Sequence, residues 1–169
     1  MRTFRLYIYS IIKCLLPETR AFSFKAWMLR WCGAKVGRNV RINSSARFIG
    51  NGQLEICDDV WIGASNFIMT TSPARIIIGK CSDFGPQVTI ITGTHEISKS
   101  QERIAGEGLS LSVEIGEGCW LGARCLILPG VELGPRTLVG AGAVVVKSNK
   151  EGNVLLAGNP AVVKKELSP

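Results

Sequence analysis

The sequence predicts an all-β solenoid, in which short parallel strands stack as triangular coils. Three features indicate it: aliphatic residues recur at every sixth position, glycine often follows them directly, and a small or medium-sized residue stands four places further on. The best-preserved part of the aliphatic series is Ile115, Leu121, Ile127, Leu133, Val139 and Val145. A strict period of six fits neither an α-helix nor an alternating strand, but it is typical of stacked repeats.

Each six-residue repeat predicts one short strand and one turn, so three successive repeats close one triangular coil. The aliphatic side chain points inward and stacks on its counterpart one coil later, and glycine or asparagine near a corner permits a positive φ. The frame also runs upstream, with two extra residues before Ile56 and four before Ile78. Its upstream positions are Val36, Ile42, Phe48, Ile56, Ile62, Ile68, Ile78, Phe84 and Ile90. The frame predicts about five coils over residues 35–158.

The longest interruption of the frame follows the only histidine, His95. Between Ile90 and Ile115 the sequence predicts an extruded loop over residues 96–113. Loops of this length are uncommon in compact domains unless they are functional. A lone histidine is weak evidence by itself, but this position makes His95 the first candidate for chemistry.

The ends of the chain lie outside the repeat. Residues 1–34 predict a basic, partly helical cap, with helices over 4–16 and 21–32 separated at Pro17. The first helix is too short and too charged to span a bilayer. It can cover the open end of the solenoid, lie on a membrane surface, or do both. Residues 159–169 are expected to form a C-terminal tail after the Gly158–Ala161 turn.

Positive charge is concentrated at the N-terminus. Residues 1–47 contain ten Lys or Arg and one acid, Glu18, a net charge of +9. The whole chain carries +7, so the rest of the chain carries 10 − 12 = −2. Such a distribution suits an anionic surface, either membrane headgroups or a phosphorylated substrate, and we expect no nucleic-acid partner.

The six cysteines form no CxxC pair and have no accompanying histidines. We therefore expect free thiols and no metal site. The N-terminal apolar run is interrupted by Lys13 and lacks a small-residue cleavage site, so no signal peptide is expected. These features predict a cytoplasmic protein, with association at the inner face of the membrane as an extension.

Three segments resemble the hexapeptide-repeat acyltransferases: IGKCSDFGPQVTIITGTH, IGEGCWLGARCLILPGVELGPRTLVGAGAVVVKS and AGNPAVVKKEL. They are most similar to the galactoside, maltose and nodulation-factor O-acetyltransferases. The segment LLPETRAFSFKAWMLRWCGAKVGRNVRI is similar to the lead-in of acetyltransferases for capsule, O-antigen and colanic-acid-type polysaccharides. The resemblance implies a left-handed parallel β-helix that assembles as a homotrimer with active sites between subunits. It also implies an acetyl-CoA-dependent O-acetyltransferase that modifies a sugar hydroxyl in surface polysaccharide biosynthesis.

The family resemblance gives His95 the role of general base. Imidazole suits the task because a histidine ordinarily titrates near physiological pH. The group that orients the ring is left open between Glu96, Asp83, Glu114 and a backbone carbonyl. Arg103 in the loop is expected either to contact the acceptor or to clamp the loop.

The resemblance also locates the coenzyme A groove, between the C-terminal coils of two subunits. The backbone N–H of Ala123 would stabilise the oxyanion, and Trp120 would lie beside the pantetheine arm. The remaining matched positions are Gly122, Gly140 and Ala141 along the groove, and Lys147, Lys164 and Lys165 toward the nucleotide phosphates.

The acceptor does not carry over from the family. The coil that grips the sugar in galactoside enzymes corresponds to WIGASNF in uncertain register, and the candidates for acceptor binding are Asn66, Asp83 and Arg103. An N-acetyltransferase of an amino-sugar nucleotide is the alternative enzyme, and a non-catalytic scaffold is the alternative class. A lyase of the γ-carbonic-anhydrase type needs three metal-binding histidines, and the chain has one.

Overall fold

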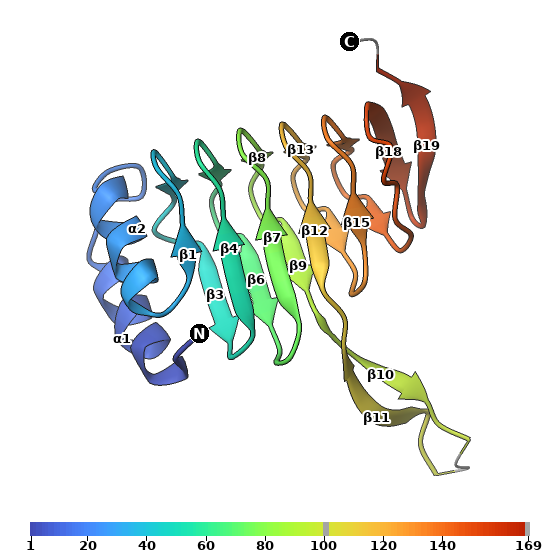
Figure 1. The fold of residues 1–169 in the computed structure, drawn as a ribbon, viewed down its shortest axis with the longest axis horizontal. Helices are drawn as coiled ribbons and strands as arrows, with labels where there is room; N and C mark the ends of the chain where they lie inside the picture. The colour runs from blue at the N-terminus through green and yellow to red at the C-terminus, as the bar shows by residue number, and fades with distance from the viewer. Residues whose placement is uncertain (100–101, 168–169) are drawn as a thin grey trace.

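The computed structural model describes residues 1–99 and 102–167. Three parallel sheets form the walls of a triangular prism, with two helices at one end (Figure 1). Sheet A contains β1 (Lys35–Val36), β4 (Gln53–Ile56), β7 (Arg75–Ile78), β12 (Val113–Ile115) and β15 (Glu132–Leu133). Sheet B contains β2 (Arg41–Ile42), β5 (Trp61–Ile62), β8 (Asp83–Phe84), β13 (Trp120–Leu121), β16 (Leu138–Val139), β18 (Val154–Gly158) and β19 (Ala161–Glu166). Sheet C contains β3 (Arg47–Gly50), β6 (Phe67–Thr70), β9 (Thr89–Ile91), β14 (Leu126–Ile127) and β17 (Val144–Val145).

The aliphatic frame forms the core, as the six-residue period predicted. In sheet B, Ile42 pairs in register with Ile62, Ile62 with Phe84, and Phe84 with Leu121. All four side chains are fully buried. Since successive side chains of a strand face opposite sides, the neighbouring residue on each strand faces outward. The prediction of a parallel β-solenoid is therefore confirmed.

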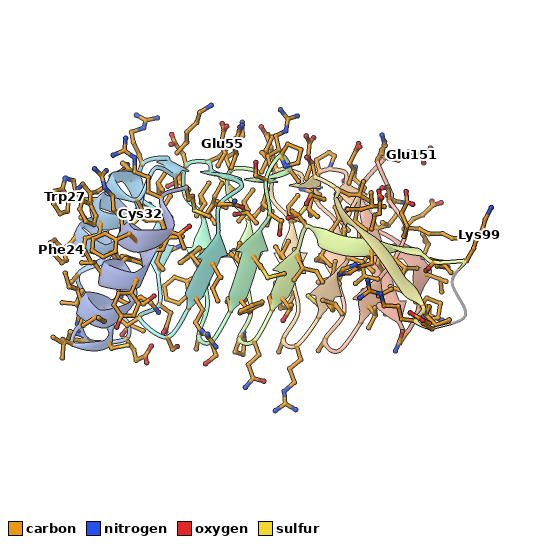
Figure 2. All side chains as sticks on the ribbon, turned by 90° about the horizontal axis from the view of Figure 1, so that it is seen from below. Phe24, Trp27, Cys32, Glu55, Lys99 and Glu151 are labelled. Atoms are coloured by element: carbon orange, nitrogen blue, oxygen red, sulfur yellow. The ribbon has the colours of Figure 1, made fainter. Side chains whose placement is uncertain are left out.

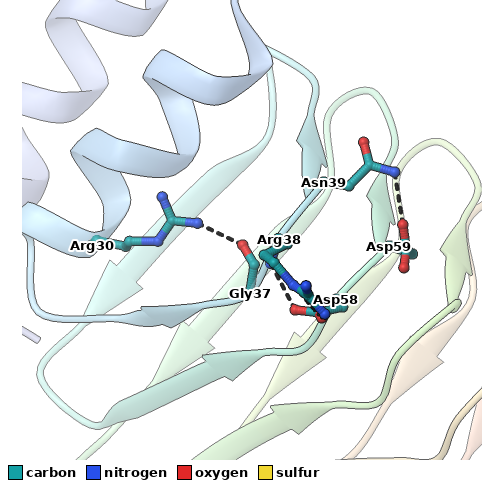
Figure 3. Close-up of polar contacts among 6 residues, drawn as sticks. All are labelled: Arg30, Gly37, Arg38, Asn39, Asp58 and Asp59. Carbon is teal, nitrogen blue, oxygen red and sulfur yellow. Dashed lines mark hydrogen bonds and ion pairs between the residues drawn. The ribbon is translucent and has the colours of Figure 1, made fainter.

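Residues with positive φ turn the chain at the corners of the prism. At the corner between sheets A and B, Asn39, Asp59 and Cys81 all have positive φ. Figure 3 shows this corner, where Asn39 Nδ2 donates to Asp59 Oδ1 at 2.7 Å and Arg38 pairs with Asp58. The hydrogen bonds from Arg38 lower the pKa of the Asp58 carboxyl below its ordinary value.

The interruptions of the frame all fall at one corner, between sheets C and A. The extra residues before Ile56 form the Gly50–Gly52 turn after β3, and those before Ile78 form the turn that follows β6. The excursion after Ile90 leaves from the same corner. It therefore extends an edge of the prism and leaves the stacked walls intact.

The number of coils was predicted slightly too low. Sheet B contains six successive parallel strands, β2, β5, β8, β13, β16 and β18. The last coil is shortened: Leu133 forms a bridge with Asn149, where three full repeats would bring Glu151, and Val139 pairs with Leu156 in place of Ala157. A coil of less than three full repeats breaks the six-residue frame, so the sequence pattern does not count it.

The predicted C-terminal tail, residues 159–169, is mostly regular in the structure. It forms strand β19 antiparallel to β18 as far as Glu166. Residues 168–169 lie outside the described part of the chain. The end of the prism farthest from the helices is therefore closed by a hairpin of β18 and β19.

The N-terminal cap contains α1 (Thr3–Cys14) and α2 (Phe22–Trp31), so both predicted helices are present with ends that differ by one or two residues. Tyr9 of α1 packs on Phe48 of the first coil, with ring centroids 6.1 Å apart. Two buried lysines fasten the cap: Lys13 Nζ donates to the carbonyls of Ser44 and Ala46, and Lys25 Nζ donates to Ser44 Oγ. Burial lowers the pKa of both ammonium groups. Within the described residues, neither helix is long and apolar enough to cross a bilayer.

Candidate active site

His95 lies on a two-stranded hairpin that projects from the corner between sheets C and A (Figure 1). The hairpin pairs β10 (Gly93–Ile97) with β11 (Ala105–Ser110) in antiparallel register. The extruded segment predicted over 96–113 is thus a hairpin arm, and it begins at Gly93, two residues before His95. The coil ends at Thr92, whose carbonyl accepts from the N–H of Leu111 at 2.9 Å, and His95 lies within the projecting arm. Residues 100 and 101 of the predicted loop lie outside the described residues.

The imidazole of His95 is oriented by the opposite strand. Its Nδ1 lies 3.0 Å from the carbonyl oxygen of Gly106. Because a carbonyl only accepts, this contact requires a proton on Nδ1, and in the neutral ring Nε2 then carries the free lone pair. The side chain is exposed, so this lone pair is available to a group that approaches from outside.

Of the orienting groups that the sequence left open, a backbone carbonyl is the one that contacts the ring in this structure. Glu96 follows His95 on β10 and is exposed, and the Nδ1 bond goes to Gly106. Asp83 lies on sheet B, and Glu114 pairs with Arg75 at 2.8 Å. No acidic side chain therefore holds the ring of His95 within the described part of this chain.

Glycines on β11 give His95 its surroundings. Gly108 lies opposite His95 in the hairpin register. A Cβ atom added to Gly108 would meet nothing within 4 Å, whereas one added to Gly106 would lie 3.0 Å from the carbonyl oxygen of Glu96. Gly106 thus allows the close strand approach that holds the ring, and Gly108 leaves open space beside it.

Four of the predicted coenzyme A positions, Gly122, Ala123, Gly140 and Ala141, lie at another corner, between sheets B and C. Ala123 follows β13 and Ala141 follows β16, one coil apart. Within the part of the chain that the structure describes, the N–H groups of Ala123 and Ala141 have no hydrogen-bond acceptor. These two N–H groups could donate hydrogen bonds to a thioester carbonyl and to the amide carbonyls of a pantetheine arm, and the small side chains leave them accessible. The residues at this corner are therefore compatible with coenzyme A.

Gly122 and Gly140 have a structural reason for lacking a side chain. A Cβ atom on Gly122 would lie 2.6 Å from the backbone nitrogen of Ala141, and one on Gly140 would lie 3.0 Å from Cβ of Ala157. Glycine at these two positions is therefore required by the stacking of one coil on the next. Their small size alone is no evidence for a ligand.

A groove of about 410 Å³ lies on the outer face of sheet B, with Trp120 among the residues that line it. Asp83 is the register neighbour of both Trp61 and Trp120, so the three side chains project from the same outer face of sheet B. Arg41 forms the far end, with its guanidinium carbon 5.1 Å from the centre of the Trp61 ring. Aromatic faces and hydrogen-bonding side chains in one groove suit a ring with an apolar face and hydroxyl groups, such as a sugar.

The structure does not unite the remaining predicted site residues. Asn66 is fully buried, and its Nδ2 donates to the carbonyls of Gly63 and Gly85. It stabilises a corner and is too deep to bind an acceptor. Arg103 is exposed near the hairpin tip, and Lys147 follows β17 at the corner between sheets C and A. Lys164 and Lys165 lie on β19 at the end of sheet B, away from that corner.

His95 and Ala123 cannot act on the same molecule from within one chain. Ala123 precedes β14 at the start of sheet C, and the hairpin leaves after β9 at the opposite end of that sheet. Because β9 and β14 pair in register, Ala123 is level with Pro86, six residues before Thr92. At roughly 3.3 Å per residue, the width of sheet C places Ala123 about 20 Å from Thr92, where the hairpin that carries His95 begins. A site that uses both residues needs a second copy of the chain.

This combination defines a class: a parallel β-solenoid with small-residue corners and one accessible imidazole on a projecting arm. Among the described residues, no group of three or more His, Cys, Asp or Glu side chains could hold a metal ion.

Residues 112–147 match the family model described as bacterial transferase hexapeptide (six repeats). WcaF of Escherichia coli K12, named for acetyltransferase activity in colanic acid biosynthesis, is 34% identical over 145 residues, which cover 86% of this chain and 76% of WcaF. A galactoside O-acetyltransferase of Lactococcus lactis is 33% identical over 132 residues, covering 78% of this chain and 55% of the enzyme. The crystal structure of a maltose O-acetyltransferase from Clostridium difficile 630 superimposes with a TM-score of 0.68 at 22% identity, covering 99% of this chain and 87% of the other.

The chain belongs to the bacterial hexapeptide-repeat transferase family. It is thus an enzyme of the transferase class, as the sequence resemblance predicted.

Sequence reasoning missed three residues of this site. Trp61 occupies the same place in WIG as Trp120 does in WLG, so the repeat could have predicted two tryptophans on the same wall of the solenoid. Gly106 and Gly108 alternate with Glu107, so both glycines fall on the same face of a strand and leave that face without side chains. The hydrogen bond to His95 depends on hairpin register, which the sequence did not show.

Proposed function

We propose that the protein is an acetyl-CoA-dependent O-acetyltransferase that modifies a sugar hydroxyl in surface polysaccharide biosynthesis. The observation that carries the proposal is the accessible His95, with Nδ1 fixed by Gly106 and Nε2 free. Two findings support the reaction and substrate class: the similarity to WcaF and to galactoside O-acetyltransferase, and the groove between Trp61 and Trp120.

His95 acts as the general base. Nε2 accepts the proton of the acceptor hydroxyl as its oxygen attacks the thioester carbonyl, and the carbonyl of Gly106 keeps the ring in the required tautomer. When bound, acetyl-CoA would supply the activated acetyl group, with the thiolate of coenzyme A as the leaving group. The proton can then pass from His95 to the departing sulfur, which returns the ring to its starting state.

Ala123 stabilises the negative charge that develops on the carbonyl oxygen. Its unpaired N–H is fixed by the corner, where the carbonyl of Ala123 accepts from the N–H of Gly142 at 2.8 Å. A donor that is already in place needs no reorganisation during the reaction. Trp120 and Ala141 line the approach of the pantetheine arm, and Lys147, Lys164 and Lys165 are proposed to contact the phosphates from the two subunits that form the groove.

A homotrimer completes each site. The outward side chains of sheet C are mostly apolar, whereas those of sheet A are mostly charged and form ion pairs such as Lys35–Glu55 and Arg75–Glu114. The apolar series on sheet C is Ile49, Phe67, Met69, Ile91, Leu126 and Val144. Packing this wall against another copy would bring the hairpin of one subunit to the Ala123 corner of the next.

Product analysis tests the proposal. The protein is incubated with acetyl-CoA and a panel of sugars, nucleotide sugars and polysaccharide repeat units. We expect an acetyl ester that is released by mild base. A base-stable amide would instead show the alternative, an N-acetyltransferase of an amino-sugar nucleotide. Absence of transfer to every member of a panel that includes both hydroxyl and amine acceptors would contradict the enzyme proposal.

A further inference from the structure

The outward face of the cap is strongly apolar. Three large side chains of α1 and that of Leu15, its C-cap residue, are between 51% and 83% exposed, and three of α2 are between 37% and 56% exposed. Together they form what we call the cap face: Phe4, Tyr7 and Ile11 of α1, Leu15 directly after it, and Phe24, Trp27 and Trp31 of α2. Single exposed apolar residues are common, but a contiguous set marks an interaction site.

Helical spacing explains why these residues form one surface. Successive members from Phe4 to Leu15 are three, four and four residues apart, and those on α2 are three and four apart, so each set occupies one side of its helix. The buried residues of α1, Leu6, Tyr9 and Lys13, repeat with similar spacing on the opposite side. Each helix therefore has two faces, one against the solenoid and one in solvent.

The two exposed faces lie at the same end of the prism (Figure 1). Both helices cover the first coil with their buried sides and lie at the end of the prism farthest from β19 (Figure 1). Figure 2 shows Phe24 and Trp27 directed away from the prism, while Cys32 lies against it. The rings of Phe24 and Trp27 stack with centroids 5.8 Å apart.

A cation lies at the cap face. Arg5 of α1 lies over the ring of Trp31 at 4.7 Å and donates to the Trp31 carbonyl at 2.7 Å, which places a guanidinium between the two helices. Arg2 and Arg20 are also exposed in the cap, whereas the guanidinium of Arg30 donates to the carbonyls of Val36 and Gly37 in the first coil. The only acid in residues 1–34 is Glu18, whose carboxylate accepts from the N–H of Ser45.

This charge distribution selects the partner. Aromatic rings beside arginines match the interface of an anionic bilayer, where the rings enter the headgroup region and the guanidinium groups contact phosphates. A second cap face would bring its own cations close to these, and the repulsion disfavours self-association through this surface.

We propose that the cap face docks on anionic lipid, with α1 and α2 lying in the plane of the membrane interface. The prism then stands on the membrane, with β19 at its distant end. If the protein is a trimer about an axis parallel to the prism, three cap faces contact the same bilayer and strengthen one another. The docking does not depend on the reaction that the solenoid catalyses.

Vesicle flotation tests the docking. The full chain is mixed with vesicles of phosphatidylcholine alone, or of equal parts phosphatidylcholine and phosphatidylglycerol. We expect binding to the anionic vesicles, weakened by salt. Trp27→Ser combined with Phe4→Ser should reduce the partition constant about tenfold or more, because two anchors are lost. Val162→Ser, which alters an exposed valine at the other end of the prism, should bind normally.

Circular dichroism and sedimentation velocity accompany the assay. Both substituted side chains are exposed, so the variant is expected to fold and assemble like the unaltered chain. Failure of the full chain to float with anionic vesicles would overturn the proposal, as would equal flotation of the double variant. A change in subunit number in the double variant, with vesicle binding unchanged, would show that a second copy covers this face.

Discussion

Replacing His95 with alanine is expected to lower kcat by about two to four orders of magnitude, the usual contribution of a positioned general base. The imidazole is exposed on the hairpin, and its Nδ1 bonds to the Gly106 carbonyl. Its removal leaves the core untouched, so the variant should fold and assemble normally. The KM for acetyl-CoA should change little, because the residues proposed to bind it lie at another corner. The measurements are steady-state kinetics and sedimentation velocity.

Glu96→Gln is the matched control. It changes the neighbouring side chain on the same strand, which the ring of His95 does not use for its Nδ1 bond. We expect less than a tenfold loss, in contrast to the histidine variant. Full activity of His95→Ala would refute the mechanism, and a loss in Glu96→Gln as large as that in His95→Ala would assign the orienting role to the carboxylate.

Replacing Phe84 with alanine is expected to destabilise the fold by about 3–5 kcal/mol, the usual cost of removing a buried phenyl ring. Phe84 is fully buried, pairs in register with Ile62 and Leu121, and lies under the groove beside Trp120. The ring fills the centre of a coil whose neighbours are fixed by strand pairing, so the cavity cannot collapse easily. The measurement is the shift of the denaturant midpoint at fixed protein concentration.

Phe24→Ala provides the comparison for Phe84→Ala. The same ring is removed, but from an exposed position on α2, and the expected change is within about 0.5 kcal/mol. If the two variants unfolded at the same denaturant concentration, the inward orientation of the six-residue frame would be wrong.

The fold could be predicted because the solenoid repeats one local rule. Ile62, Phe84 and Leu121 all occupy the same inward position of the repeat. Because the same six-residue spacing recurs along the chain, each repeat strengthens the prediction. The short final coil escaped because the partners of Leu133 and Val139 lie closer in sequence than three full repeats and no longer keep the frame. The cap helices were predictable from their apolar spacing and from Pro17.

The candidate site was only partly predictable. His95 was indicated by its place at the longest interruption, but its position on a regular hairpin depends on cross-strand pairing that no periodicity shows. Asn66 illustrates the opposite error: a polar side chain in a repeat can be a buried corner residue that bonds to backbone carbonyls. His95 and Ala123 are separated because they lie at different corners of the prism. The corner that each residue occupies is known only from the three-dimensional structure.

The most direct test of the shared active site is subunit complementation. His95→Ala and Ala123→Trp chains are each expected to be inactive as homotrimers, with Ala141→Trp as a second blocking variant at the same corner, one coil away. When the two inactive chains are refolded together in equal amounts, about a quarter of the sites should combine an intact histidine with an intact corner, since each site draws on two neighbours of a closed ring. Recovery of roughly a quarter of normal activity would support a site built by two subunits. Mixed trimers without activity would contradict it.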